Sequence, residues 1–144
     1  MSVVETLLIS DGEGATTVIW ASRHLPLPRQ VGELRRLLGP IRVVQLSGRI
    51  PNAEFIVDAA RKHAAKVIVP VLPLSMVARL VELARNYGFE VWWAEMEQVN
   101  QGAGKPPRVD EAEETVLHSP EGWKVMRFRR FHRIKAVKLD LEPL

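Results

Sequence analysis

Cysteine is absent from the 144-residue sequence. This absence excludes disulfide bonds, thiolate zinc sites and a cysteine nucleophile, and it is typical of cytoplasmic proteins. Long hydrophobic runs are also missing. The longest clear one, residues 67–74, contains two prolines and is far shorter than the ~18 residues of a membrane-spanning helix. The first ten residues lack the basic start of a secretory signal. We therefore expect a cytoplasmic protein without a membrane segment.

Asparagine and glutamine are few, whereas arginine, glutamate, valine and leucine are abundant, a bias that is typical of thermophilic proteins. Hydrophobic residues make up 47% of the sequence and charged residues 26%, as in ordinary globular domains. A chain of this length buries enough surface to form one core. We therefore expect a single domain over residues 1–144.

The net charge of +3 is unevenly distributed. Residues 121–144 contain seven basic and three acidic residues, a net +4, while the other 120 residues contain thirteen basic and fourteen acidic, a net −1. All of the excess positive charge therefore lies in the last segment, where a polyanionic partner would be attracted first.

Residues 41–73 predict a βαβ unit, because two short apolar runs rich in β-branched residues flank a segment of helical composition. The apolar periodicity predicts strands at 16–21, 41–46, 66–71 and 89–94 and helices at about 28–38, 53–65 and 75–87. Three strand–helix repeats favour an α/β fold. We expect a small three-layer, Rossmann-like or flavodoxin-like, mostly parallel sheet with three helices and a core at about 15–97.

Antiparallel strands are expected at both ends of the chain. Residues 6–10 and 16–21 flank a glycine-bearing turn and therefore predict an N-terminal hairpin. A linker-like loop at about 99–109 precedes a C-terminal antiparallel β extension over about 113–141. The apolar alternation changes phase between Phe128 and Phe131, which predicts a β-bulge or a bend. We expect this extension to lengthen one edge of the sheet or to reach a partner subunit.

Two adjacent tryptophans, Trp92 and Trp93, point to opposite faces of one predicted strand. The sheet must then be covered on both sides at this point, and three helices are few for two faces. We therefore predict a homodimer.

No motif for a phosphate-bearing cofactor or a metal is complete. Gly12 and Gly14 match part of the dinucleotide fingerprint, but a strand follows them instead of a helix. Residues 102–105 match part of a phosphate-binding loop, but Pro106 stands where that motif needs Ser or Thr. The four histidines are scattered, without metal-ligand spacing. We expect no cofactor and no bound metal.

The loops at the carboxyl ends of the predicted parallel strands are the candidate binding site, because ligands of open α/β sheets bind there. Arginines, hydroxyl groups and helix N-termini at this edge favour an anionic small molecule or nucleotide. The candidate ligand-binding residues are Ser22, Arg23, His24, Ser47, Gly48, Arg49, Asn52 and Ser75. In the alternative interpretation, Asn52 and Ser75 only cap helices, while the two arginines are solvated loop residues.

A second candidate surface is the basic run that begins near residue 123. Arginines neutralise phosphates and aromatic faces stack on bases, so this composition favours nucleic acid. The candidate residues are Trp123, Lys124, Arg127, Phe128, Arg129, Arg130, Phe131 and Arg133. The alternative is an amphipathic edge strand whose positive side chains are solvated, pair with the acidic residues 110–114, or guard against edge-to-edge aggregation.

A catalytic triad drawn from Ser22 or Ser47 with His24 and Glu95 is the weakest candidate, because no Gly-x-Ser-x-Gly elbow is present. The sequence therefore predicts a non-catalytic binding or assembly protein that recognises a phosphate-bearing ligand at the strand ends. Nucleic-acid binding by the basic run is the first alternative, and a small hydrolase or nuclease-like enzyme is the second.

Overall fold

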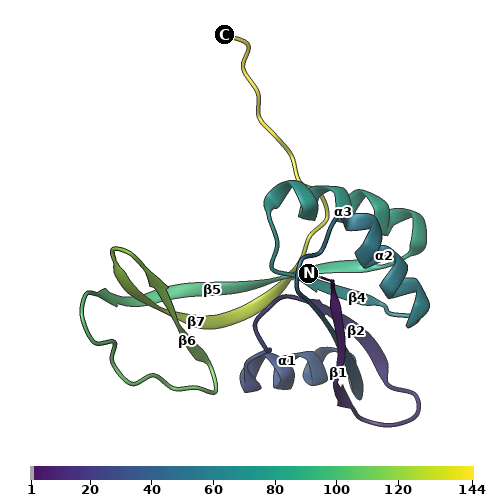
Figure 1. The fold of residues 1–144 in the computed structure, drawn as a ribbon. Helices are drawn as coiled ribbons and strands as arrows, with labels where there is room; N and C mark the ends of the chain where they lie inside the picture. Colours follow the sequence, from purple (N-terminus) through teal and green to yellow (C-terminus); the bar gives the residue numbers. More distant parts are fainter. Residues whose placement is uncertain (1) are drawn as a thin grey trace.

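The computed structural model describes residues 2–144 as one seven-stranded mixed sheet with three helices (Figure 1). The strands lie in the order β1-β3-β2-β4-β5-β7-β6. The elements are β1 (Val4–Ser10), β2 (Thr16–Ala21), α1 (Pro28–Leu38), β3 (Ile41–Ser47), α2 (Ala53–Lys62), β4 (Val67–Pro70), α3 (Leu74–Tyr87), β5 (Glu90–Gly102), β6 (Glu114–Ser119) and β7 (Gly122–Arg133).

The centre of the sheet is parallel and is covered on both faces. Strand β2 pairs in parallel with β3 on one side and with β4 on the other. Alternate residues of β2 point to opposite faces: Ile19 packs in the core cluster under α2 and α3, whereas Val18 packs in the cluster under α1. These strands are almost continuously apolar because both of their faces are buried.

The helices form at the predicted positions for local reasons. Pro28 occupies the first turn of α1, where its missing N–H costs nothing. The side chain of Asn52 accepts a hydrogen bond from the backbone N–H of Phe55 at 2.8 Å and caps α2. Gly88 adopts the left-handed conformation that ends α3.

The predicted N-terminal hairpin is wrong, because β1 pairs antiparallel with β3 and β3 separates it from β2. A β1–β2 hairpin would displace β3 or β4 from β2, because both edges of β2 are already paired in parallel. The connection is held by Asp11, whose carboxylate accepts two hydrogen bonds from Arg35 and one from the N–H of Ile41. Asp11 therefore ties the end of β1 to both α1 and β3.

At strand β5 the pairing in the sheet changes from parallel to antiparallel. This strand pairs with β4 only at Glu90 and Val91, and from Trp92 to Gly102 it pairs antiparallel with β7. Strand β7 also pairs antiparallel with β6. The strands β5, β7 and β6 extend away from the helices in Figure 1, and the whole sheet curls into a half-barrel.

The predicted three-layer, Rossmann-like or flavodoxin-like, mostly parallel sheet is therefore wrong. Antiparallel pairs join more residues than parallel pairs do, and no helix covers the outer part of β5. The predicted linker at 99–109 is partly strand, since β5 continues to Gly102, and the C-terminal strands end at Arg133 rather than near residue 141. The predicted bulge is present: Arg129 is the extra residue of β7 opposite Glu95 and Met96.

The two adjacent tryptophans lie on opposite faces of β5, as the alternation requires. Trp92 is buried in the cluster under α1. The side chain of Trp93 is 51% exposed and stacks on the ring of His132, with 5.4 Å between the ring centroids. No helix of residues 2–144 is long and apolar enough to cross a membrane.

Replacing Asp11 by asparagine tests how β1 is attached. The hydrogen bond from Arg35, followed by that from Ile41, lowers the pKa of Asp11 from 3.8 to about 2. A lowered pKa means that the carboxylate stabilises the fold above pH 3.8 and that this contribution is lost as the pH falls towards 2. We expect D11N to melt at a lower temperature than the wild type at neutral pH, with the difference closing between about pH 4 and pH 2. Circular dichroism melts measure both, and a difference independent of pH would contradict this role.

Candidate ligand-binding site

The ends of three parallel strands meet at one edge of the sheet. Ala21 of β2 is level with Leu46 of β3 and with Pro70 of β4. The chain leaves all three strands at the same height, and the connections diverge, with α1 on one face and α2 and α3 on the other. This is the switch point where ligands of open α/β sheets bind.

Six of the eight predicted ligand-binding residues line one cavity of about 330 Å³ at this edge, which we call the rim. They are Ser22, Arg23, His24, Ser47, Gly48 and Arg49. The loop after β4 completes the cavity with Val71, Leu72 and Pro73. The other two predicted residues lie outside it, because Asn52 caps α2 and Ser75 lies in the first turn of α3, where Pro73 takes the cap position.

Hydrogen bonds fix the loop after β2. The backbone N–H of His24 donates to Oγ of Ser22 at 3.1 Å, and Nε2 of Gln45 donates to the carbonyl of Ser22 at 3.0 Å. The indole N–H of Trp20 donates to the carbonyl of His24 at 2.9 Å. Ser22 is buried, so its side chain holds the loop in place and preorganises the rim.

The loop after β3 requires a glycine. Gly48 has a φ of +93°, and a Cβ at this position would lie 2.7 Å from the backbone oxygen of Ser2. The glycine therefore lets the N-terminal segment pass close to the rim while the chain turns towards Arg49.

The rim is electropositive. Within residues 2–144, neither Arg23 nor Arg49 forms an ion pair, and no carboxylate lines the cavity. The backbone N–H groups of Arg23, Gly48 and Arg49 also have no hydrogen-bond partner in this part of the chain. Helix α3 begins directly after Pro73 and adds the positive end of its dipole. The arrangement can accept an anion.

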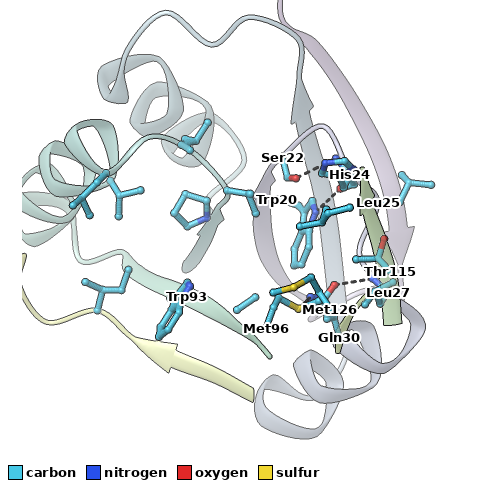
Figure 2. Close-up of a pocket in the computed structure, with 18 of the residues that line it drawn as sticks. Trp20, Ser22, His24, Leu25, Leu27, Gln30, Trp93, Met96, Thr115 and Met126 are labelled. Atoms are coloured by element: carbon cyan, nitrogen blue, oxygen red, sulfur yellow. Dashed lines mark hydrogen bonds between the residues drawn. The ribbon is translucent and has the colours of Figure 1, made fainter. Parts of the chain in front are cut away.

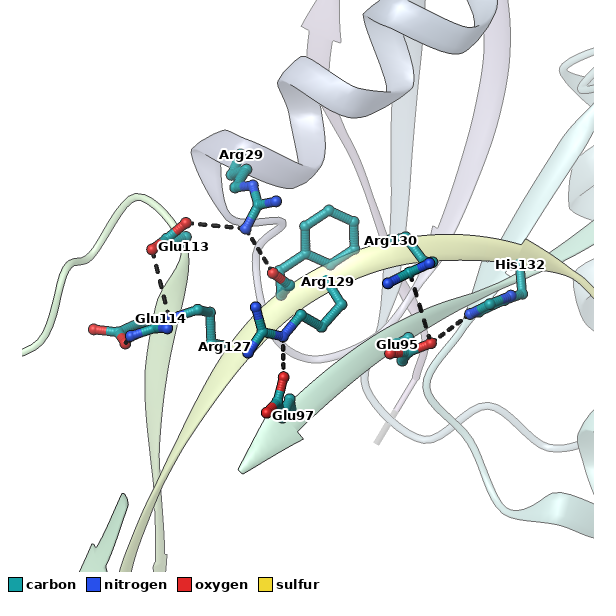
Figure 3. A network of polar contacts seen from close by, with 10 residues as sticks. Arg29, Glu95, Glu97, Glu113, Glu114, Arg127, Arg129, Arg130 and His132 are labelled. Carbon is teal, nitrogen blue, oxygen red and sulfur yellow. Dashed lines mark hydrogen bonds and ion pairs between the residues drawn. The ribbon is translucent and has the colours of Figure 1, made fainter. Parts of the chain in front are cut away.

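The residues of the suggested triad are not assembled. Glu95 contacts His132 and Arg130 rather than His24 (Figure 3). The hydrogen bond from His132 is the main cause that lowers the pKa of Glu95. The hydroxyl of Ser22 accepts from a backbone N–H, and no imidazole contacts it within residues 2–144. Over the same residues, no group of three or more acidic or histidine side chains could hold a metal ion.

The arginines of the second candidate surface are paired with carboxylates (Figure 3). Arg127 contacts Glu114 at 2.7 Å and Glu113 at 3.5 Å, both in the acidic segment that sequence analysis offered as a partner. Hydrogen bonds from the backbone of Asp110 and from Arg127 lower the pKa of Glu114. The other pairs are Arg129–Glu97, Arg130–Glu95 and Arg133–Glu90.

The aromatic residues of that surface point inwards. Phe128 is 1% exposed, with the guanidinium of Arg29 over its ring at 5.7 Å. Phe131 packs against Phe128, Trp20 and Trp92. Trp123 is half-buried against Gly102, while Lys124 is exposed. These contacts favour a structural role for β7 over base stacking.

A second and larger cavity of about 590 Å³ adjoins the rim, and we call it the apolar groove (Figure 2). Trp20, Trp93, Met96 and Met126 lie along it, and Leu117 of β6 closes one side. No pattern in the sequence predicted this groove, because its lining residues come from segments between β2 and the residues after β7. The one local indication was that Trp93 points to the opposite face of its strand from Trp92.

Searches for related proteins found no protein family, no curated protein and no solved structure that matches this chain.

Two substitutions that each remove one positive charge distinguish the arginines of β7 from the arginines of the rim. We expect R127Q to lower the melting temperature, because it leaves Glu114 without its ion-pair partner and removes one of the two arginines that contact Glu113. The matched variant R49Q removes the same charge from a residue that forms no ion pair, and we expect its melting temperature to equal that of the wild type. Calorimetry measures both, and equal destabilisation by the two variants would contradict this division.

Proposed function

We propose that this protein binds an anionic, phosphate-bearing ligand at the rim and acts as a binding protein rather than an enzyme. The observation that supports it most is the convergence of Arg23 and Arg49, which have no carboxylate partner within residues 2–144, on one cavity. Charge-assisted hydrogen bonds from guanidinium groups are the strongest that proteins offer to phosphate. The absence of cysteine supports a location in the cytoplasm.

The geometry of the loops adds to this support. The unpaired N–H groups of Arg23, Gly48 and Arg49 provide donors that need a partner, and water or an anion is the available acceptor. The hydrogen bonds around Ser22 hold the first loop before any ligand binds, so little ordering cost accompanies binding. Nucleic-acid binding by β7 is the weaker proposal, because its arginines already contact carboxylates and Phe128 is buried.

Binding of inorganic phosphate, pyrophosphate and a nucleoside monophosphate, measured by calorimetry at low salt, tests the rim. We expect the double variant R23Q/R49Q to bind at least about tenfold more weakly, because each lost charge-assisted hydrogen bond contributes roughly 1.5–3 kcal/mol. The control is R108Q, which removes one exposed positive charge outside the rim and should bind like the wild type. Equal loss in R108Q, or unchanged binding in the double variant, would show that the rim is not the site.

We also propose that the protein forms a homodimer through its C-terminal tail, residues 138–144. The tail extends away from the body in Figure 1, and all of its residues are exposed. Leu139 and Leu141 are 73% and 81% exposed, and leucines in water favour association. No hydrogen bond or ion pair joins the tail to the rest of residues 2–144.

Light scattering coupled to gel filtration tests the tail. We expect the mass of a dimer for the full chain and the mass of a monomer for the variant L139S/L141S, whose changes lie outside the folded core. L37S changes a leucine on α1 that is 45% exposed, and it should remain dimeric. A monomeric wild type would overturn the proposal, and so would a dimer that survives the tail substitutions.

A further inference from the structure

The rim and the apolar groove are adjacent cavities. Ser22, His24, Val71 and Leu72 line both of them. A molecule whose charged end contacts Arg23 and Arg49 therefore has the apolar groove within reach of its other end. The two cavities differ in chemistry: arginines and free N–H groups lie in one, and apolar side chains lie in the other.

Inside the groove, the polar side chains of Trp20 and Gln30 already have hydrogen-bond partners. The indole N–H of Trp20 donates to the carbonyl of His24. The side chain of Gln30 accepts from the N–H of Leu27 and donates to the sulfur of Met96 (Figure 2). A polar group placed among these side chains would lose its hydrogen bonds to water without replacing them. The groove therefore selects for an apolar occupant.

Large hydrophobic side chains that face water are concentrated here. Five of the exposed ones line the groove: Leu25, Val71, Leu74, Trp93 and Leu117. They come from two loops, from the first residue of α3 and from two strands, so no single element explains their gathering. Exposed apolar side chains that gather in one groove are a feature of ligand-binding sites.

We propose that the natural ligand is a single amphipathic molecule, with a phosphate head at the rim and an unbranched or prenyl-like hydrocarbon body in the apolar groove. This inference rests on the function proposed for the rim and specifies its class of ligand. The cavity volume of about 590 Å³ lies in the range of roughly 300–1,000 Å³ that small-molecule sites occupy. The occupant is one molecule taken out of water, because the groove is a partly enclosed cavity lined by residues of β2, α1, α3, β5, β6 and β7 rather than a flat face.

A series of alkyl phosphates tests the proposal. Calorimetry compares methyl, hexyl and decyl phosphate, each below the concentration at which it forms micelles, with uncharged decanol. We expect affinity to rise up to about fourfold for each methylene that enters the groove. Decanol should bind at least about tenfold more weakly than decyl phosphate, because it lacks the charge that the arginines contact.

Substitutions at two equally exposed leucines test whether the hydrocarbon chain binds in the groove rather than elsewhere on the surface. Leu117 lines the groove and is 44% exposed, while Leu37 on α1 is 45% exposed and lies elsewhere. We expect L117Q to weaken decyl phosphate binding roughly threefold to tenfold and to leave methyl phosphate unchanged. L37Q should behave like the wild type with both ligands.

The outcomes separate this inference from the proposal for the rim. If methyl and decyl phosphate bind equally tightly and both depend on Arg23 and Arg49, the amphipathic ligand is wrong and anion binding at the rim stands. Chain-length dependence that R23Q/R49Q does not alter would overturn both. Sedimentation with vesicles of phosphatidic acid and phosphatidylcholine is the membrane control, and binding to vesicles without binding to monomeric decyl phosphate would overturn the inference.

Discussion

The parallel pairing of β2 with both β3 and β4 is the constraint on which the rest of the structure depends. Because Ala21 is level with Leu46 and Pro70, three loops start at the same height of the sheet. The crossovers then run to opposite faces, which keeps the space above β2 open. Arg23 and Arg49 are neighbours for this reason, although 25 residues separate them in the sequence. A shift of one residue in either pairing would move one of these loops away from the level of the other two.

Strand β5 links this parallel centre to a different kind of sheet. No helix follows it, so nothing returns the chain to extend the parallel order, and its free edge pairs with β7 instead. The strand continues well beyond the helices and takes β7 and β6 with it. The sheet curls, and residues of β5, β6 and β7 line the apolar groove together with residues of α1 and α3. The strands that make the fold unlike a three-layer sheet therefore also form part of this groove.

For anion binding, the ion pairs that each arginine forms matter more than the net charge of its segment. The last segment contains the excess positive charge, yet its arginines contact glutamates of β5 and β6. The rest of the chain has a net negative charge, yet it contains Arg23 and Arg49, which have no acidic partner within residues 2–144. Because salt screens exposed charges beyond about 10 Å, the immediate neighbours of an arginine decide whether it attracts an anion.

The sequence alone predicted the positions of the three helices and of most strands, a phase change between Phe128 and Phe131, and the residues at the parallel strand ends. These features follow from short-range patterns: apolar periodicity, caps such as Asn52, and prolines and glycines at the ends of elements. Other features could be seen only in the assembled structure. Strand β1 pairs with β3, and β5 leaves the parallel sheet. The β7 arginines contact carboxylates, and a groove lies beside the rim. Which distant strands pair depends on which of them occupies each edge of the sheet. The apolar periodicity within one segment contains no information about that choice.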